Sequence, residues 1–302
     1  MGVSSLLDRA LHGLVAAMVT PYRGDLTVDL DAAGELAGWL ADGGVDGVLV
    51  AGTTGELGLL RPSEVAALAG RVSEVVGGRA AVIAGVRGEN PWQAAEAARA
   101  AVDSGADAVL VPPPCYHRTG PEGLLQFYSR LADAVDAPVI VYNIPSRTRV
   151  EVPPEVVGRL AGEHSNIAAL KATTENPWYV AEVRRQAPRL PVLAGLDEAV
   201  ILALNYGASG AVLASANVAP TTARRLLGSW SQGQYRVALE AQEEVERVMW
   251  ALRPGRSLQG AIKAALSLLG LPVEPRVRPP LPGEDQESLG EIKRRLELVG
   301  LL

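Results

Sequence analysis

The chain has 302 residues but only one cysteine, Cys115. A single cysteine excludes a disulfide within the chain and any zinc or iron–sulfur centre built from cysteines. The three histidines are scattered along the sequence, which argues against a histidine-rich metal centre. The formal net charge of −6 provides no electrostatic attraction for nucleic acid or for an anionic membrane surface. We therefore expect no metal, no nucleic-acid partner and no membrane partner.

The sequence also lacks a clear membrane or export signal. Asp8 and Arg9 precede any long apolar run, so the first ten residues do not resemble a signal peptide. Residues 199–223 carry no charged side chain and are long enough to cross a bilayer, but polar residues and glycines interrupt them. We predict a buried helix, a glycine turn and a buried strand there, in a cytoplasmic protein.

Lysine is scarce, because only three of the 28 basic residues are lysines and the others are arginines. An amine can lose its proton and attack carbon, whereas a guanidinium stays protonated. Lys171 lies in the apolar run 167–172, where burial favours the neutral amine that a Schiff base requires. The alternatives are a buried ion pair with Glu56 or Glu175, or a lysine at a strand end that reaches water.

Short apolar runs alternate with segments of helical spacing that begin with proline or aspartate. Their lack of polar alternation is typical of strands buried on both faces of a parallel sheet. Eight such strands predict an α/β fold, the (β/α)8 TIM barrel; a doubly wound sheet is disfavoured because no Gly-x-Gly-x-x-Gly follows an early strand. The expected strands are 14–19, 47–51, 80–86, 108–111, 138–144, 167–172, 192–195 and 210–215.

The pattern becomes wholly helical beyond the eighth barrel helix, which begins near Pro220. Helices are expected over 234–252, 257–269 and 287–298, with a proline-rich linker before the last. We divide the chain into a barrel, residues 1–231, and a C-terminal helical domain, residues 232–302.

Polar residues gather where the expected strands end, which is where barrel enzymes carry their active sites. The loop 52–55 contains Thr53 and Thr54 between glycines, and is either a nest for a carboxylate or phosphate or a plain turn. Tyr142 ends the fifth strand, where its ring belongs either to the core or to the barrel centre. Arg147 follows it and suits bidentate recognition of a carboxylate, or pins a loop.

These motifs together resemble one family. Gly52-Thr53-Thr54-Gly55-Glu56, Tyr142-Asn143-Ile144-Pro145-Ser146-Arg147-Thr148 and Leu170-Lys171 are similar to the dihydrodipicolinate synthase / N-acetylneuraminate lyase family, and the resemblance covers nearly the whole chain. It implies a pyruvate-dependent class I aldolase with no cofactor beyond a lysine imine, and a homotetramer built as a dimer of dimers.

The resemblance also implies roles for single residues. Lys171 would form the imine with pyruvate, whose carboxylate would lie on Thr53 and Thr54. Tyr142 and Thr54 would relay protons together with Tyr116, which would reach in from a neighbouring subunit. The pyruvate pocket would further be lined, through backbone, by Gly195 and Val212.

The substrate that accompanies pyruvate depends on Arg147. An arginine there favours a carboxylated aldehyde such as L-aspartate 4-semialdehyde, as in the 4-hydroxy-tetrahydrodipicolinate synthases. The sequence departs from those synthases after Lys171, where Ala172-Thr173-Thr174-Glu175 follows, and at Arg149, a second cation expected near the entrance. The alternatives are an aldolase or dehydratase for a 2-keto-3-deoxy sugar acid or sialic acid, and a barrel that binds a 2-oxo acid without turnover.

The sequence also leads to expectations about two further residues, Cys115 and Lys263. Cys115 stands where lysine-inhibited synthases often have an aromatic residue, so we predict no strong feedback inhibition by lysine. Lys263 lies on an amphipathic helix, where a solvated or interface position is expected.

Overall fold

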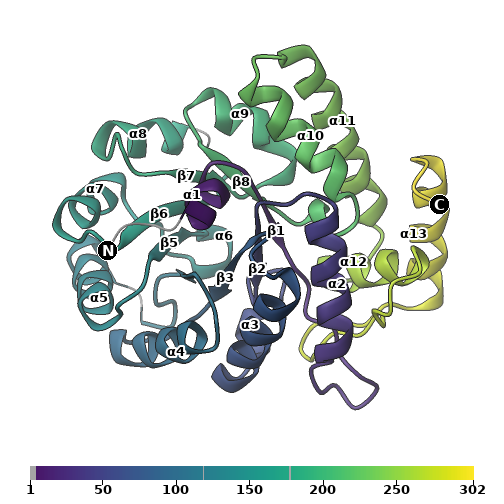
Figure 1. Ribbon diagram of the computed structural model, residues 1–302, viewed down its shortest axis with the longest axis horizontal. Coiled ribbons are helices and arrows are strands. Elements are labelled where there is room, and N and C mark those ends of the chain that lie inside the picture. Colours follow the sequence, from purple (N-terminus) through teal and green to yellow (C-terminus); the bar gives the residue numbers. More distant parts are fainter. Residues whose placement is uncertain (1–4, 118, 177) are drawn as a thin grey trace.

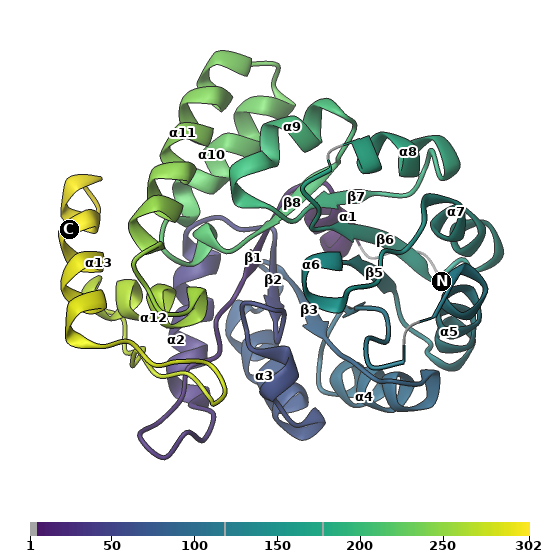
Figure 2. The ribbon, with the colours of Figure 1, turned by 180° about the vertical axis from the view of Figure 1, so that it is seen from behind.

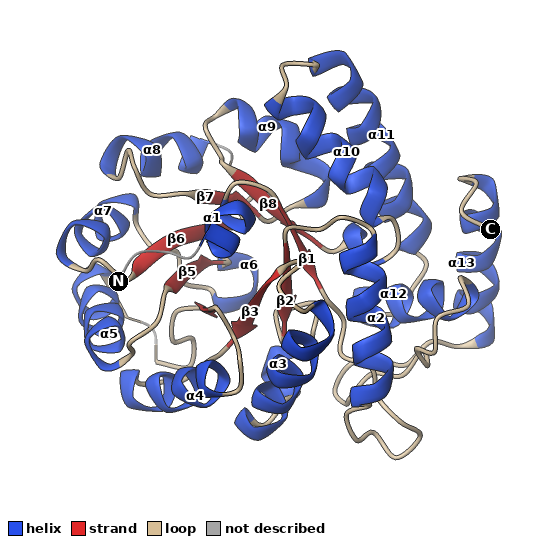
Figure 3. Ribbon diagram, viewed as in Figure 1, coloured by secondary structure: helices blue, strands red, loops and turns tan. Residues whose placement is uncertain are grey.

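The computed structural model describes residues 5–117, 119–176 and 178–302. Within them, eight parallel strands pair in sequence order and close, because β8 pairs with β1 (Figure 3). Every strand is buried along its whole length, as the unbroken apolar runs predicted. The strands are β1 Leu14–Ala17, β2 Gly47–Val50, β3 Ala81–Gly85, β4 Ala108–Val111, β5 Val139–Asn143, β6 Ile167–Ala172, β7 Val192–Ala194 and β8 Gly210–Leu213.

A ring of helices surrounds the strands (Figure 1). Most begin with a proline in the first turn, where its missing N–H costs no hydrogen bond. The predicted (β/α)8 barrel is confirmed, with boundaries that differ from the expected ones by a few residues. The ring consists of α2 Leu30–Asp42, α3 Pro62–Val76, α4 Pro91–Asp103, α5 Pro121–Ala134, α7 Pro154–Glu163, α8 Trp178–Gln186, α9 Val200–Asn205 and α10 Pro220–Ser231.

Two of the short helices occupy opposite ends of the barrel. Helix α1, Ser5–Leu11, lies at the end seen in Figure 1, and α6, Pro145–Thr148, lies at the end seen from behind in Figure 2. Leu7, Ala10 and Leu11 of α1 are buried against the side chains of the barrel interior. Helix α1 therefore closes the end of the barrel at which the strands begin. Neither helix was expected from the sequence.

A similar short sequence that begins with glycine precedes three of the strands, β2, β4 and β8. Gly44, Gly105 and Gly207 each have a positive φ, as expected for glycine after a helix. Two residues later, the carboxylate of Asp46 accepts from the N–H of Leu14, and that of Asp107 accepts from the N–H of Val82. Each side chain thus ties the start of its strand to the preceding one in the sheet.

The C-terminal helices extend the barrel on one side (Figure 1). They are α11 Tyr235–Leu252, α12 Leu258–Leu268 and α13 Gln286–Leu298. Helix α11 packs along α10, while α12 reaches the loop that follows β2. The uncharged stretch 199–223 forms α9, a glycine turn, β8 and the start of α10, and no helix within the described residues is long and apolar enough to cross a membrane.

Candidate active site

Lys171 and Tyr142 lie side by side inside the barrel. They are direct partners in the register between β6 and β5, so both side chains leave the sheet on the same face. Only 4% of Lys171 and 2% of Tyr142 is exposed. The Nζ of Lys171 is 4.4 Å from the centre of the Tyr142 ring. A buried amine next to a phenol can form an imine and exchange a proton at the same place.

The environment of Tyr142 favours its phenolate. Burial alone would raise the pKa of Tyr142, but the Lys171 ammonium and hydrogen bonds with Thr53, Thr173 and Lys171 lower it below its ordinary value. The hydroxyl of Thr53 lies 3.2 Å from the Tyr142 hydroxyl. These contacts make the phenol ready to give up its proton.

The loop after β2 has the form of an anion nest. Ala51 and Glu56, on either side of it, have positive φ angles of 52° and 63°. A Cβ atom on Gly55 would come within 2.9 Å of backbone atoms of Ala51 and Met18, so only glycine fits. Within the described chain, the N–H groups of Thr53, Thr54 and Gly55 donate to no other residue. They are available to a carboxylate.

Arg147 is presented by the loop after β5. It lies on the single turn α6, which ends at Arg149 with a positive φ of 58°. The hydroxyl of Thr148 lies 3.0 Å from the carbonyl of Ile144 and 2.9 Å from that of Val150, and its contact with them holds this turn. The exposed Arg147 side chain is held at the mouth of the barrel.

A cavity of about 280 Å³ opens above Tyr142. Arg147 and Arg87 line it together with Glu89, whereas Arg149, the expected second cation, is not among its lining residues. Partial burial raises the pKa of Glu89, but hydrogen bonds from the N–H of Tyr116 and from Arg87 outweigh it, and the pKa is lowered. The second cation at the entrance is therefore Arg87, next to a charged carboxylate.

Gly195 and Val212 come from the β7 and β8 side of the barrel, and neither is among the residues that line this cavity. Val212 on β8 is 3% exposed and belongs to the side chains that fill the interior. Gly195 follows β7 and donates its N–H to the carbonyl of Ala172 at 2.9 Å. A Cβ on Gly195 would collide with the hydroxyl of Thr173, so glycine is required for the close packing here.

Tyr116 is the predicted site residue that does not join the others within one chain. Its side chain is 82% exposed and its ring packs edge-on against His117. Its backbone N–H donates to Glu89 at 2.9 Å, which fixes the loop after β4 but leaves the ring facing outward.

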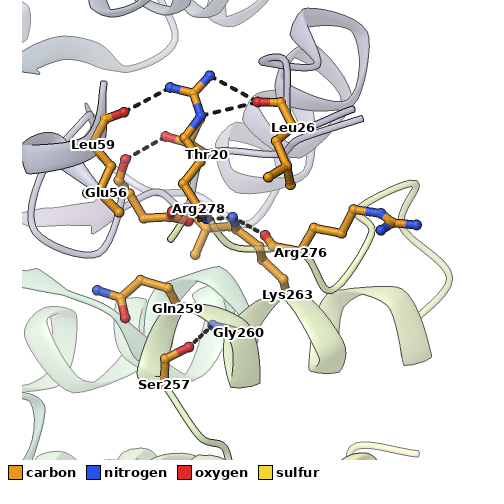
Figure 4. Close-up of polar contacts among 12 residues, drawn as sticks. Thr20, Leu26, Glu56, Leu59, Ser257, Gln259, Gly260, Lys263, Arg276 and Arg278 are labelled. Atoms are coloured by element: carbon orange, nitrogen blue, oxygen red, sulfur yellow. Dashed lines mark hydrogen bonds and ion pairs between the residues drawn. The ribbon is translucent and has the colours of Figure 1, made fainter. Parts of the chain in front are cut away.

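The expectation for Lys263 was wrong. Its side chain is wholly buried, and its Nζ lies 2.6 Å from Glu56 rather than in solvent (Figure 4). Glu56, considered above as a partner for Lys171, therefore pairs with another lysine. The scarcity of lysine, which drew attention to Lys171, applied equally to Lys263 and was the signal that could have found it.

Three further residues were not singled out for the site. Gln259 of α12 and Arg87 line the cavity, and Thr173 contacts the Tyr142 hydroxyl. Within residues 5–117, 119–176 and 178–302, no three histidine, cysteine or carboxylate side chains are grouped to hold a metal ion.

Comparison with known proteins shows the family of this chain. Residues 10–298 match the model of the dihydrodipicolinate synthetase family. The chain belongs to this family. An uncharacterized DapA-like lyase of Thermofilum pendens is 34% identical over 97% of this chain and 99% of its own. The 4-hydroxy-tetrahydrodipicolinate synthase of Chlorobium phaeovibrioides is 32% identical over 98% and 99%.

A solved structure extends the family comparison to the fold. YagE of Escherichia coli K12, a family member in complex with pyruvate, superposes with a TM-score of 0.91 at 28% identity, covering 96% of this chain and 99% of YagE. The chain is therefore a lyase of this family that acts on small molecules, and it is similar both to relatives named as synthases and to relatives named as DapA-like lyases.

Proposed function

We propose that the protein is a 4-hydroxy-tetrahydrodipicolinate synthase, which condenses pyruvate with L-aspartate 4-semialdehyde through an imine on Lys171. The observation that carries this proposal is the buried amine of Lys171, 4.4 Å from the ring of Tyr142, which itself lines a cavity together with Arg147. Such an amine is the nucleophile of a class I aldolase.

The first half of the reaction uses the residues inside the barrel. The Nζ of Lys171 adds to C2 of pyruvate and water leaves, while Tyr142 supplies and recovers the proton. The pyruvate carboxylate lies on the N–H groups of Thr53 and Thr54, and the backbones of Gly195 and Val212 complete the pocket. Loss of a proton from C3 of the imine then gives an enamine. The imine is the electron sink, so the reaction needs no metal or other cofactor.

The second half takes place in the cavity above. The enamine C3 attacks the aldehyde carbon of the semialdehyde and forms the new carbon–carbon bond. The amino group of the semialdehyde then attacks C2, closes the ring and displaces Lys171 as the free amine. Arg147 binds the carboxylate of the semialdehyde, for which a guanidinium is well suited.

A second candidate is the cleavage of a 2-keto-3-deoxy sugar acid through the same imine. The observation in its favour is the hydroxyl of Thr173, which contacts Tyr142 and adds a hydrogen-bonding group for a substrate hydroxyl. The same hydroxyl lies 3.5 Å from the carbonyl of Gly195, so it faces the inner part of the site.

We also propose a homotetramer in which Tyr116 and Thr54 join the proton relay across a subunit boundary. The outward-facing ring of Tyr116 supports this, since it is 82% exposed and, among the described residues of its own subunit, its one ring contact is with His117. Mass measurement in solution tests the assembly, and a monomer with full activity would contradict the role of Tyr116.

The test of the chemistry is intact mass after borohydride treatment with pyruvate. Reduction of the imine adds about 72 Da to the native protein and nothing to the Lys171→Ala variant. Failure of the folded native protein to gain this mass would overturn the proposal and favour a barrel that binds without turnover. Turnover with aspartate semialdehyde, against pyruvate release from 2-keto-3-deoxygluconate or N-acetylneuraminate, then separates the two candidate functions.

A further inference from the structure

Two side chains on one face of helix α12, in the C-terminal domain, form hydrogen bonds with the loop of the anion nest. The Nε2 of Gln259 donates to the carbonyl of Thr53 at 3.0 Å, and the Nζ of Lys263 donates to Glu56 at 2.6 Å. Gln259 and Lys263 are four residues apart, so they lie one above the other on the helix. Both ends of the loop 53–56 are thus held by a segment more than 200 residues away.

The buried amine of Lys263 has further partners besides Glu56 (Figure 4). Its Nζ also donates to the carbonyl of Arg276 at 2.6 Å and lies 4.2 Å from the centre of the Tyr22 ring. The second oxygen of Glu56 accepts from the N–H of Arg278 at 3.0 Å. An ion pair buried so completely, with hydrogen bonds to both partners, holds one geometry.

That geometry includes a backbone conformation that Glu56 would not adopt unaided. Its φ of 63° lies in the left-handed region, which is unfavourable for a side chain of this kind. Such residues persist where the surroundings over-determine them, and they gather at functional sites. Here the surroundings are Lys263 and Arg278.

The contact of Gln259 helps to fix which way an N–H group of the nest points, together with the N–H of Glu56, which donates to the same Thr53 carbonyl at 3.2 Å. A trans peptide is planar, so its C=O and N–H point in opposite directions. The Thr53 carbonyl points toward Gln259, and the N–H of Thr54 in the same peptide must point away from α12. The Gly55 carbonyl is held in turn by the Thr20 hydroxyl at 2.7 Å.

We propose that Gln259 and Lys263 are positioning residues that set the affinity of the Thr53–Thr54 loop for the carboxylate of a 2-oxo acid. The C-terminal domain is then part of the substrate-binding machinery and not only a covering for the barrel. This inference rests on the proposed function, because it assigns the carboxylate of pyruvate to this loop.

The experiment measures borohydride trapping of pyruvate at increasing pyruvate concentration. In Gln259→Leu, the half-saturating concentration should rise roughly tenfold, the factor that corresponds to one hydrogen bond, while the trapped fraction at saturation stays complete. A role confined to stability would instead lower the melting temperature and leave half-saturation unchanged.

Gln242→Leu is the matched control. Gln242 is 6% exposed against 7% for Gln259, and its Nε2 also ties a C-terminal helix to a barrel carbonyl, that of Asp197, at 2.9 Å. It belongs to α11 and does not touch the loop after β2. Its loss should lower the melting temperature and leave half-saturation within about twofold, the margin of an unaltered site.

Lys263 is tested in a paired substitution, because Lys263→Met alone would leave Glu56 buried without its counter-charge. Glu56→Gln with Lys263→Met removes both charges, and half-saturation should again rise. Unchanged half-saturation in Gln259→Leu and in the paired variant, or an equal rise in Gln242→Leu, would overturn the inference. Absence of any trapped adduct in the native protein would overturn the proposed function instead.

Discussion

The amine of Lys171 and the ring of Tyr142 are neighbours across two strands in direct register, with the amine 4.4 Å from the ring centre. Neither residue depends on a mobile loop for its place. The pair is therefore formed by the sheet itself, before any substrate binds. Positions on strands hold reacting groups more rigidly than positions on loops.

Replacement of Tyr142 by phenylalanine should slow imine formation by a factor of about 10²–10⁴, the range for loss of a general acid–base group. Half-saturation by pyruvate should change little, because the anion nest is intact. Rapid-quench trapping with borohydride measures the rate. Tyr179→Phe is the control, since it removes a buried hydroxyl that donates to the Val152 carbonyl at 2.7 Å, outside the site. An equal slowing in both variants would contradict the role of Tyr142.

The lowered pKa of Tyr142 is measurable in the native protein. Burial raises the pKa of Tyr22, Tyr128 and Tyr179 well above 10, so these three tyrosines stay protonated up to pH 10. Because the pKa of Tyr142 is lowered, we expect the transition in tyrosinate absorbance that appears first as the pH is raised to be lost in Tyr142→Phe.

The variant Lys171→Met tests whether the charge of Lys171 lowers the pKa of Tyr142. Without the ammonium, the burial of Tyr142 remains and its pKa should move upward, out of the range of the transition. A transition at the same pH in native protein and Lys171→Met would mean that the lysine charge does not act on the phenol.

Arg147 should determine the acidic co-substrate. Loss of a charged hydrogen-bonding group in Arg147→Ala should lower kcat/KM for aspartate semialdehyde by about 10- to 100-fold, with pyruvate trapping unchanged. Arg149→Ala is matched, because it removes an arginine two residues away that is exposed and does not line the cavity. Equal activity of both variants on aspartate semialdehyde would refute the assignment.

Affinity for pyruvate should decline above pH 8. Burial lowers the pKa of Lys263 to about 8, although Glu56 opposes this shift. Above that pH the Lys263 amine becomes neutral and its ion pair with Glu56 is lost. Arg278 and Tyr22 are the other titratable groups that face the Lys263 amine. Trapping at several pH values should show a weakening in native protein that is absent from Glu56→Gln with Lys263→Met. Parallel pH profiles would rule this out.

Asp46 should matter for stability and not for catalysis. Its carboxylate accepts from the N–H of Leu14 at 2.9 Å and from Arg224 at 2.6 Å. Asp46→Asn should lower the free energy of unfolding by about 1–3 kcal/mol, the value for a charged hydrogen bond. Asp107→Asn, which alters the equivalent contact to Val82 without an arginine, should cost less. Denaturant unfolding compares the two, and an equal loss would contradict the contribution of Arg224.

The barrel could be predicted because its signals are local. A strand buried on both faces is apolar at every position, and the glycines after the helices mark where each strand begins. Lys171 was recognisable for the same reason, as a charge inside such a run. Helices α1 and α6 could not be predicted, since seven and four residues are too few for a helical period to emerge.

The scarcity of lysine singled out Lys263, but its contacts could not be predicted because its partners come from elsewhere in the chain. One lysine on an amphipathic helix normally belongs to its solvated face. Whether that face is solvated depends on Glu56, which is 207 residues earlier in the sequence. The contact of Gln259 with Thr53 is equally long-range, and nothing in the local sequence of α12 indicates it.

The closure of one end of the barrel by α1 has a kinetic consequence. Because α1 closes one end of the barrel, reactants reach Lys171 from the end at which the strands end. The reactant that bonds to Lys171 must enter before the second reactant, which would otherwise block its path. Under the proposed function, pyruvate therefore binds before the aldehyde. Under that function, water leaves as the imine forms and before the second reactant binds, so initial rates measured against one reactant at fixed levels of the other should give parallel double-reciprocal lines, the pattern of substituted-enzyme kinetics.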